Sequence, residues 1–444
     1  MPDRKGLSDV SPGRKSTIST RSNSTHVSRT SSDSGPVEHS GSTAALNSDV
    51  ESNREYGMPT TIDTTNPAHE NDTTNGKTHN GVHHRHYHKF YKGRKKSTGS
   101  PAPHEQHRVL ACTVDAGVTD NRVYPPDGLC DYLLFRNVLF QKGKFIAADN
   151  ESASLSMFKE ASRDSNATAF GYALDFGTFD TVAEGNRPVD MKPAIVNAAA
   201  RHAIRGIGVL DLTNVLLDED MNSTQRFFQE NRKSLPSEGF MFIGIEAPSS
   251  INQLLRLAHI AKDVDIAILR THVEFSPDSP CVVAYPGAWA GRGQPGQRET
   301  VQILGNLTND TSTAWLVSFQ LGVLAYEGSS QVLDVGQNCS THYTLGYDDV
   351  CREQRDTVVD EQALVVFQQG KGSGTYRTFE TSETLERKIV LFLNAMASCG
   401  IHVGVALFDI QFENYETDCS SDNTIPRRFS RLSTTKYVLE LYTV

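Results

Sequence analysis

Eight apolar runs of strand length, separated by stretches with helical periodicity, constrain the fold of this chain more than any other feature. The runs cover residues 109–114, 131–140, 168–176, 206–212, 240–247, 265–273, 314–324 and 403–410. Helices are predicted at 193–204, 223–232, 251–261 and 382–397, and from about residue 429. Buried strands that alternate with helices are typical of parallel sheets. We therefore predict an α/β fold, a (β/α)8 TIM barrel with a short insertion between strand 7 and helix 7.

A doubly wound open sheet is the main alternative to the barrel. Such folds bind phosphate groups through a glycine-rich loop that follows a strand and opens a helix. Residues 291–296 carry closely spaced glycines, but they include a proline, and we predict a turn with no helix behind it. A polar insertion that contains cysteines is predicted at residues 328–374. The absence of a phosphate loop favours the barrel.

The first 107 residues differ in composition from the rest of the chain. They are crowded with Ser, Thr, Asn, Gly and His, and they hold too few large apolar residues to offset the entropy of an ordered chain. We predict a disordered tail at 1–107 and a globular domain at 108–444. The tail has 14 Lys and Arg against 11 Asp and Glu, whereas the domain has 29 against 42. A negative domain argues against nucleic acid as the main partner.

The tail ends in a segment rich in His, Lys and Arg, at residues 83–96. Such a segment is usually solvated, but a basic cluster also contacts anionic membrane surfaces weakly. No run of about 20 apolar residues follows it, and the first 30 residues lack a signal-peptide core. No targeting segment is therefore visible in this chain.

The domain nevertheless has features of secreted proteins. Six asparagines lie in Asn-x-Ser/Thr sequons, namely Asn150, Asn166, Asn222, Asn306, Asn309 and Asn338. All seven cysteines are in the domain, without a CxxC pair or a cysteine–histidine nucleophile pattern. We expect no metal and no cofactor. We predict an extracellular glycoprotein, or one tethered to a membrane with the barrel outside.

Several segments resemble glycoside hydrolase family 18, the chitinases and chitinase-like proteins. They are VLACTV from Val109, GLCDYLLF from Gly128, LGYDDVC from Leu345, and GVALFDI from Gly404 with the acidic loop and Cys419 behind it. Their order along the chain is more specific than any one of them. The resemblance implies a barrel over nearly all of residues 108–444 and a sugar-binding mouth.

The same resemblance places the family's catalytic acids on residues that are not acids. The family's fourth strand carries the pattern DxxDxDxE, and alignment on Gly206 sets Gly208, Leu210 and Leu212 at the acid positions. In family members the Glu protonates the glycosidic oxygen, and the acetamido group of the substrate is the nucleophile. The resemblance therefore implies a pseudo-glycosidase that is not an enzyme. A register shift on this strand would bring Asp211 into the site.

The resemblance also suggests disulfides and sugar contacts. We predict Cys112–Cys130 between strands one and two, and Cys351–Cys419 between the insertion and the loop after strand eight, with Cys281, Cys339 and Cys399 left unpaired by this reasoning. Phe408 corresponds to the family's tryptophan that floors the sugar site. The full set of candidate sugar-binding residues is Tyr172, Phe176, Asp211, Tyr326, Phe408 and Asp409.

Three functional hypotheses remain open from the sequence. The first is an inactive barrel that binds chitin or N-acetylglucosamine oligomers, or the glycans of glycoproteins. The second is a weakly active glycoside hydrolase with relocated acids at strand ends, namely Asp175, Asp211, Glu246 and Asp409. The third is an extracellular interaction protein that binds a receptor and no sugar, as imaginal disc growth factors of this family are thought to do.

Overall fold

The structure is a computed structural model of the chain. It describes residues 108–444 except 149–151, 185–189, 276–279, 292–295, 308–311, 330–331, 352–356, 371–373, 416–427 and 443–444. The predictions for the tail at 1–107, including its basic end, lie outside the described residues.

Eight parallel strands close into a barrel, as the alternating pattern predicts. The barrel strands are β1 (Val109–Val114), β2 (Tyr132–Gln141), β4 (Ala169–Leu174), β5 (Ile204–Leu212), β6 (Phe240–Glu246), β7 (Ile266–Arg270), β8 (Ala314–Gln320) and β14 (His402–Phe408). Each strand pairs in parallel with the next one, and β1 pairs with both β14 and β2, which closes the sheet. Strand β3 (Lys144–Ala147) extends β2 as an antiparallel hairpin. The TIM barrel is confirmed.

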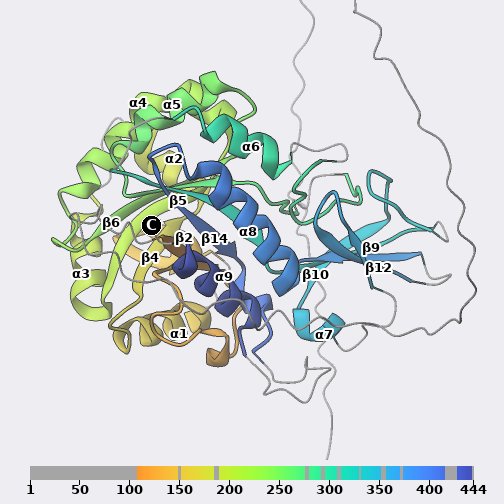
Figure 1. The fold of residues 1–444 in the computed structure, drawn as a ribbon. Coiled ribbons are helices and arrows are strands. Elements are labelled where there is room, and N and C mark those ends of the chain that lie inside the picture. The colour runs from red at the N-terminus through yellow and green to blue at the C-terminus, as the bar shows by residue number, and fades with distance from the viewer. Residues whose placement is uncertain are drawn as a thin grey trace, which may run out of the picture. The chain divides into compact units, whose positions relative to one another are not determined.

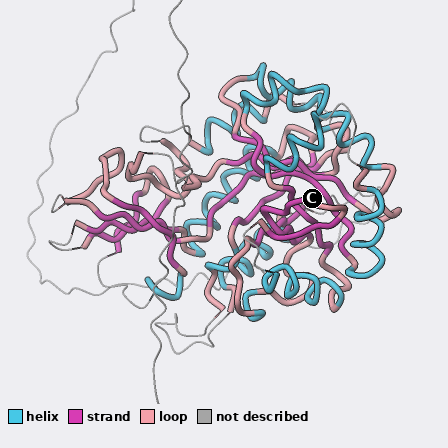
Figure 2. Tube along the Cα trace, turned by 180° about the vertical axis from the view of Figure 1, so that it is seen from behind, coloured by secondary structure: helices cyan, strands magenta, loops and turns pink. Residues whose placement is uncertain are grey.

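Helices surround the barrel on its outer side (Figures 1 and 2). They are α1 (Ser152–Arg163), α2 (Phe176–Glu184), α3 (Lys192–His202), α4 (Asn214–Arg232), α5 (Ile251–Ala261), α6 (Gln297–Leu304), α8 (Ser382–Met396) and α9 (Ser430–Leu441), with short 3-10 helices η1 (Asn121–Val123) and η3 (Ile410–Phe412). Helix α6 follows Gly296 directly, so the prediction of no helix behind residues 291–296 is wrong. Among the described residues, no helix is long and apolar enough to cross a membrane.

The insertion is more ordered than its polar sequence suggests. It forms an antiparallel sheet of β9 (Val323–Glu327), β10 (Thr341–Leu345), β11 (Thr357–Asp360), β12 (Val365–Gln369) and β13 (Thr375–Phe379), with the short helix α7 (Tyr347–Cys351). The predicted seventh strand at 314–324 is therefore two strands in two sheets. The insertion runs from the end of β8 to the start of α8, so it is not the short segment that we expected. An apolar run that continues into a second sheet cannot be divided by hydrophobicity alone.

Two apolar layers hold the barrel together. One fills its interior and includes Leu134, Leu210, Phe242 and Phe408. The other lies between the strands and the surrounding helices. Gly208 of β5 faces the interior, where an added Cβ would lie 2.0 Å from the backbone oxygen of Phe242. This close approach leaves no space for a side chain at Gly208.

A buried arginine joins the C-terminal helix to the insertion. Arg431 at the start of α9 is fully buried and makes an ion pair of 2.6 Å with Glu413. Its guanidinium also donates to the carbonyl oxygens of Glu380 and Phe412, and it lies 4.1 Å from the ring centroid of Tyr347 in α7. A buried ion pair with these added hydrogen bonds fixes the position of α9.

Two disulfides are present in the described residues. The bridge Cys112–Cys130 is confirmed, and it links β1 to the start of β2. The second is Cys281–Cys339, which the sequence did not assign, and which ties the loop after β7 to the insertion. Cys399 is free. The predicted Cys351–Cys419 bridge lies outside the described residues, because Cys419 and the side chain of Cys351 are not described.

We predict that the double variant Cys281→Ala/Cys339→Ala loses about 4 kcal/mol of unfolding free energy. The bridge closes a loop of 58 residues, and the chain-entropy model assigns a loop of this length about that stabilisation. Denaturant unfolding measures the change, with Cys399→Ala as the control for removal of a cysteine. A loss no larger than that of the control would contradict the prediction.

Candidate functional site

The candidate site lies at the C-terminal ends of the barrel strands, and irregular backbone in β5 decides which side chain enters it. The pairing of β5 with β6 shifts register between Val209 and Leu212, so that one extra residue stands in β5. Such a bulge re-aims the side chains beside it. As a result, Leu210 packs in the barrel interior while the next residue, Asp211, also points into the mouth and contacts Arg136 and Arg270. The bulge brings Asp211 into the site, which is the effect that the sequence analysis expected of a register shift on this strand.

A second irregularity, in β2, brings Arg136 into the mouth. The pairing of β2 with β4 shifts between Phe135 and Val138, and Asn137 has a φ of 57°. Asparagine tolerates this left-handed backbone better than most residues. The Asn137 amide donates to Asp115 Oδ1 at 2.8 Å, at the end of β1. The bulge therefore places the Arg136 guanidinium and the Asn137 amide at the same end of the barrel.

Arg136 is the centre of an ion network in the mouth. Its guanidinium lies 2.7 Å from Glu274, 3.3 Å from Asp211 and 3.2 Å from Asp409. The residue is 7% exposed, and burial alone would lower its pKa. The surrounding carboxylates outweigh this effect and hold the pKa of Arg136 well above its usual range.

Arg270, the last residue of β7, joins the same carboxylates from the other side. It lies 2.8 Å from Glu274 and 3.4 Å from Asp211, and it donates to the carbonyl oxygen of Leu212. Burial opposes ionisation of Glu274, but Arg136, His272 and Arg270 together lower the pKa of its carboxyl far below the usual range. His272 contacts Glu274 at 3.2 Å and Ser318 Oγ at 2.6 Å. Asp211 and Glu274 are therefore each held by two arginines.

Phe408, the predicted sugar floor, is covered by side chains of the protein itself. It is fully buried at the end of β14. The Arg136 guanidinium lies 5.2 Å from its ring centroid, and the His272 ring lies 4.3 Å from it. An exposed aromatic face is what a sugar ring stacks on. In this arrangement Arg136 and His272 take that place.

Asp409 follows Phe408 in a left-handed backbone conformation, with φ 61° and ψ 56°. Its backbone N–H donates to Thr113 Oγ1, and its carboxylate accepts from Gln320 Nε2 at 2.8 Å. Burial, and to a lesser degree the nearby charge of Asp409, raises the pKa of the Asp115 carboxyl, although Arg136 opposes this effect. Strained backbone of this kind is concentrated at functional sites.

The other acids predicted from the sequence make no ion pair with this network among the described residues. Asp175 accepts from the backbone N–H of Thr178 and so begins α2 as a helix cap. Glu246 is exposed at the end of β6. Of the four acids proposed as a relocated cluster, the structure brings together only Asp211 and Asp409, through Arg136.

Three of the aromatic candidates do not face the mouth. Tyr172 is 1% exposed and packs between β4 and the outer elements, against Phe145 and Phe158. Phe176 packs against the same outer core. Tyr326 is buried in the insertion, beside Phe275. The sequence assigned these residues to the mouth from strand ends alone, without knowing which way each side chain points.

The residues aligned with the family's acids have no polar role in the structure. Gly208 has no space for a side chain, and Leu210 packs in the barrel interior. Leu212 is 1% exposed in the layer between strands and helices. Sequence reasoning missed Arg136, Arg270, His272 and Glu274. Their signal was present, since Arg136 and Arg270 are charged residues within otherwise apolar runs.

Four of the six sequon asparagines can be placed. Asn166, Asn222, Asn306 and Asn338 are exposed, as glycan attachment requires. Asn150 and Asn309 lie outside the described residues. Whether any of them carries a glycan stays a prediction.

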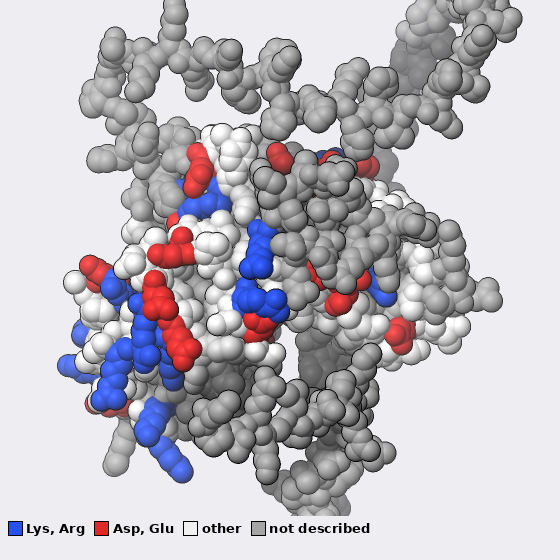
Figure 3. Space-filling model, turned by 90° about the horizontal axis from the view of Figure 1, so that it is seen from below, with Lys and Arg blue, Asp and Glu red and all other residues white. Residues whose placement is uncertain are grey.

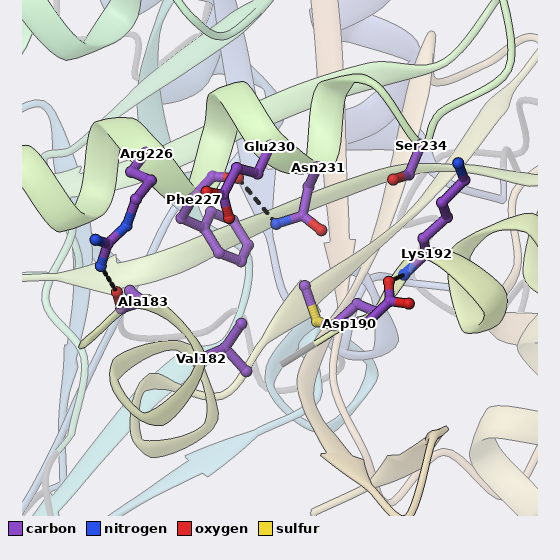
Figure 4. Close-up of a pocket in the computed structure, with 10 residues that line it drawn as sticks. Val182, Ala183, Asp190, Lys192, Arg226, Phe227, Glu230, Asn231 and Ser234 are labelled. Atoms are coloured by element: carbon purple, nitrogen blue, oxygen red, sulfur yellow. Dashed lines mark hydrogen bonds between the residues drawn. The ribbon is translucent and has the colours of Figure 1, made fainter. Parts of the chain in front are cut away.

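The domain also has a cavity away from the barrel mouth. A cavity of about 220 Å³ lies on the outer side of the barrel, lined by the end of α2, the start of α3 and one side of α4 (Figure 4). Its polar groups Arg226 and Asn231 already donate to carbonyl oxygens of the chain.

Among the described residues no group of His, Cys, Asp and Glu suits a metal ion. On the face shown in Figure 3, basic side chains are interspersed with acidic ones.

Comparison with known proteins shows the fold but not the family. No family model matches the chain, and no curated protein matches its sequence. Solved structures of chitinases and chitinase-like proteins match its fold at low sequence identity. Human YKL-39, described as a pseudo-chitinase with retained chitooligosaccharide binding properties, is 14% identical with a TM-score of 0.58, over 75% of this chain and all of that one.

Two further structures show the range of functions on this fold. The Group IV chitinase of Ostrinia furnacalis, in complex with allosamidin, is 12% identical with a TM-score of 0.59, over 76% of this chain and all of that one. The chitinase-like agglutinin of Robinia pseudoacacia is 11% identical with a TM-score of 0.54, over 74% of this chain and 99% of that one. The fold therefore supports both enzymes and non-enzymes.

We predict that the mouth network makes the domain sensitive to acid. The pKa of Glu274 is lower in the folded state than its ordinary value of 4.5, so its ion pairs stabilise the fold above that pH and lose this effect as the pH falls below it. The thermal midpoint of the wild type should fall as the pH is lowered below 4.5. Glu274→Gln should have a lower midpoint at neutral pH and a shallower fall in acid.

The matched control is Glu246→Gln, which removes an exposed glutamate at another strand end. It should keep the pH dependence of the wild type. Equal acid sensitivity in the wild type and in Glu274→Gln would show that the mouth network does not have this role.

Proposed function

We propose that this protein is a catalytically inactive chitinase-like barrel that acts by binding. The observation that carries the proposal is the pair of contacts that Asp211 makes with arginines. Asp211 is the one carboxylate on the inner side of the β5 end among the described residues, and both of its ion pairs are with arginines.

The chemistry of glycoside hydrolysis explains why this matters. The general acid must deliver a proton to the glycosidic oxygen and therefore must itself carry one. Enzymes keep such a group protonated by burying it away from positive charge. Asp211 lies instead within 3.4 Å of two guanidinium groups, and its Oδ1 is engaged in both ion pairs. Gly208, Leu210 and Leu212 have no proton to give.

The ligand that we propose is a glycan of the chitin type or of a glycoprotein. Buried polar atoms without partners support this proposal: the Nε atoms of Arg136 and Arg270, and Oε1 of Gln320. Two donors and one acceptor complement the hydroxyl groups of a sugar. The printed descriptions of YKL-39 and of the Robinia agglutinin provide precedent for binding without hydrolysis on this fold.

A weakly active hydrolase is the second candidate. It is favoured by Asp115, since a carboxyl whose pKa is raised by burial at a strand end is a candidate proton donor. Asp211 and Asp409 would then be the partner acids, whereas Asp175 and Glu246 make no ion pair with them among the described residues. A receptor-binding protein with no sugar ligand is the third candidate.

We further propose that the barrel lies outside the cell, either secreted or tethered to a membrane. Two disulfides support an oxidising compartment, and the exposed sequon asparagines fit a glycoprotein. A weak contact of the basic segment 83–96 with a membrane surface remains part of this proposal.

The proposal predicts no turnover of a fluorogenic chito-oligosaccharide by the purified protein between about pH 4 and pH 8, a range that covers the usual working pH of carboxyl acids. An active chitinase in the same assay provides the positive control. Turnover that Asp211→Asn or Asp115→Asn abolishes would overturn the inactive reading and support the hydrolase.

A further inference from the structure

The ion network of the mouth holds more acidic than basic side chains. Asp211, Glu274 and Asp409 are paired with only two cations, Arg136 and Arg270. Two of the carboxylates are the more accessible members, because the side chains of Asp211 and Glu274 are 23% and 25% exposed, against 9% and 15% for the two arginines and 10% for Asp409. A ligand that enters the mouth therefore meets negative charge first.

One carboxylate oxygen is available for a ligand. The contacts of Asp211 with Arg136 and Arg270 all use Oδ1. Among the described residues, Oδ2 has no partner. A half-buried carboxylate oxygen next to an apolar barrel interior binds an ammonium group more strongly than a neutral donor.

A buried acceptor of Gln320, at the same end of the barrel, also points to a donor-bearing ligand. Gln320, the last residue of β8, is 5% exposed, and its Nε2 donates into the network at Asp409. Its Oε1 is buried and accepts no hydrogen bond. An unsatisfied buried acceptor is rare and calls for a donor. Asp211 Oδ2 and Gln320 Oε1 are both acceptors, and they belong to one network.

The covered aromatic ring limits how deeply a sugar enters. Arg136 and His272 lie against Phe408, so a sugar ring cannot stack there while the network is intact. The ligand stays at the rim, where the accessible groups are carboxylates. An acetamido N–H can donate one hydrogen bond to such a rim, whereas a protonated amine adds the attraction between opposite charges to its hydrogen bond.

We propose that the mouth selects glycans with free amino groups, such as oligomers of glucosamine, over their N-acetylated counterparts, and that Asp211 Oδ2 receives the ammonium group. This inference rests on the proposed function, because it assumes that the mouth binds a glycan. It narrows the ligand to a cationic amino sugar.

Calorimetric titration of the full chain with glucosamine tetramer and with N-acetylglucosamine tetramer tests the inference, at about pH 6, where Asp and Glu are ionised. We expect the glucosamine tetramer to bind at least about tenfold more tightly, a preference that corresponds to one charge-assisted contact. The preference should shrink as salt is added, because screening weakens attraction between accessible charges.

Asp211→Asn removes the charge and keeps the shape of the side chain, and it should reduce the preference by about tenfold. Asp164→Asn, at an exposed acid beyond the end of α1, removes the same charge elsewhere and should leave the preference intact. Thermal midpoints of both variants establish that they are folded. If Asp211→Asn does not fold, the salt dependence of the wild-type preference tests the proposal instead.

The outcomes separate the two proposals. Tight binding of the acetylated tetramer alone, or equal binding of both, overturns the amine preference and leaves the binding function standing. An equal effect of Asp164→Asn and Asp211→Asn shows a non-specific charge effect and also overturns it. Binding of neither oligomer overturns both proposals.

Discussion

The buried guanidinium of Arg136 is the constraint on which the arrangement of the barrel mouth depends. A buried charge without partners is costly, so the strand ends around it must supply carboxylates. They come from three separate places in the chain: Asp211 near the end of β5, Glu274 after β7 and Asp409 after β14. Each of these acids is held in a fixed position by the same cation. The loops that usually vary most in a barrel are here tied together by charge.

This network accounts for both the stability and the proposed inactivity of the mouth. In a glycosidase, the acid at this end of the barrel must exchange a proton, and an aromatic ring must be free for the sugar. Here the carboxylates are engaged with Arg136 and Arg270, and the ring of Phe408 lies against Arg136 and His272. The groups that could bind or cleave a sugar are instead bound to one another. What remains accessible is the outer side of the carboxylates, from which the preference for amino sugars follows.

The sequence was sufficient for the architecture because the barrel depends on local patterns. Seven of the eight apolar runs each became one strand within a few residues of its predicted ends, whereas the run at 314–324 became two. The site was harder to predict because it depends on distant contacts. The bulge in β5 turns Asp211 inward, which no hydrophobic period reveals. The positions of the Tyr172 and Tyr326 side chains were hard to predict for the same reason. The strand pattern does not show which apolar core each side chain enters. The pairing of Cys281 with Cys339 spans two sheets and is likewise non-local.

The arginines of the mouth should hold its acids even when a glycan is present. A crystal structure of the protein with a bound chito-oligosaccharide would show whether they do. We expect the Arg136 guanidinium still to contact Asp211, Glu274 and Asp409, with the sugar at the rim and no sugar atom against Phe408. A sugar ring stacked on Phe408, with Arg136 displaced and Asp211 facing the glycosidic oxygen, would contradict it.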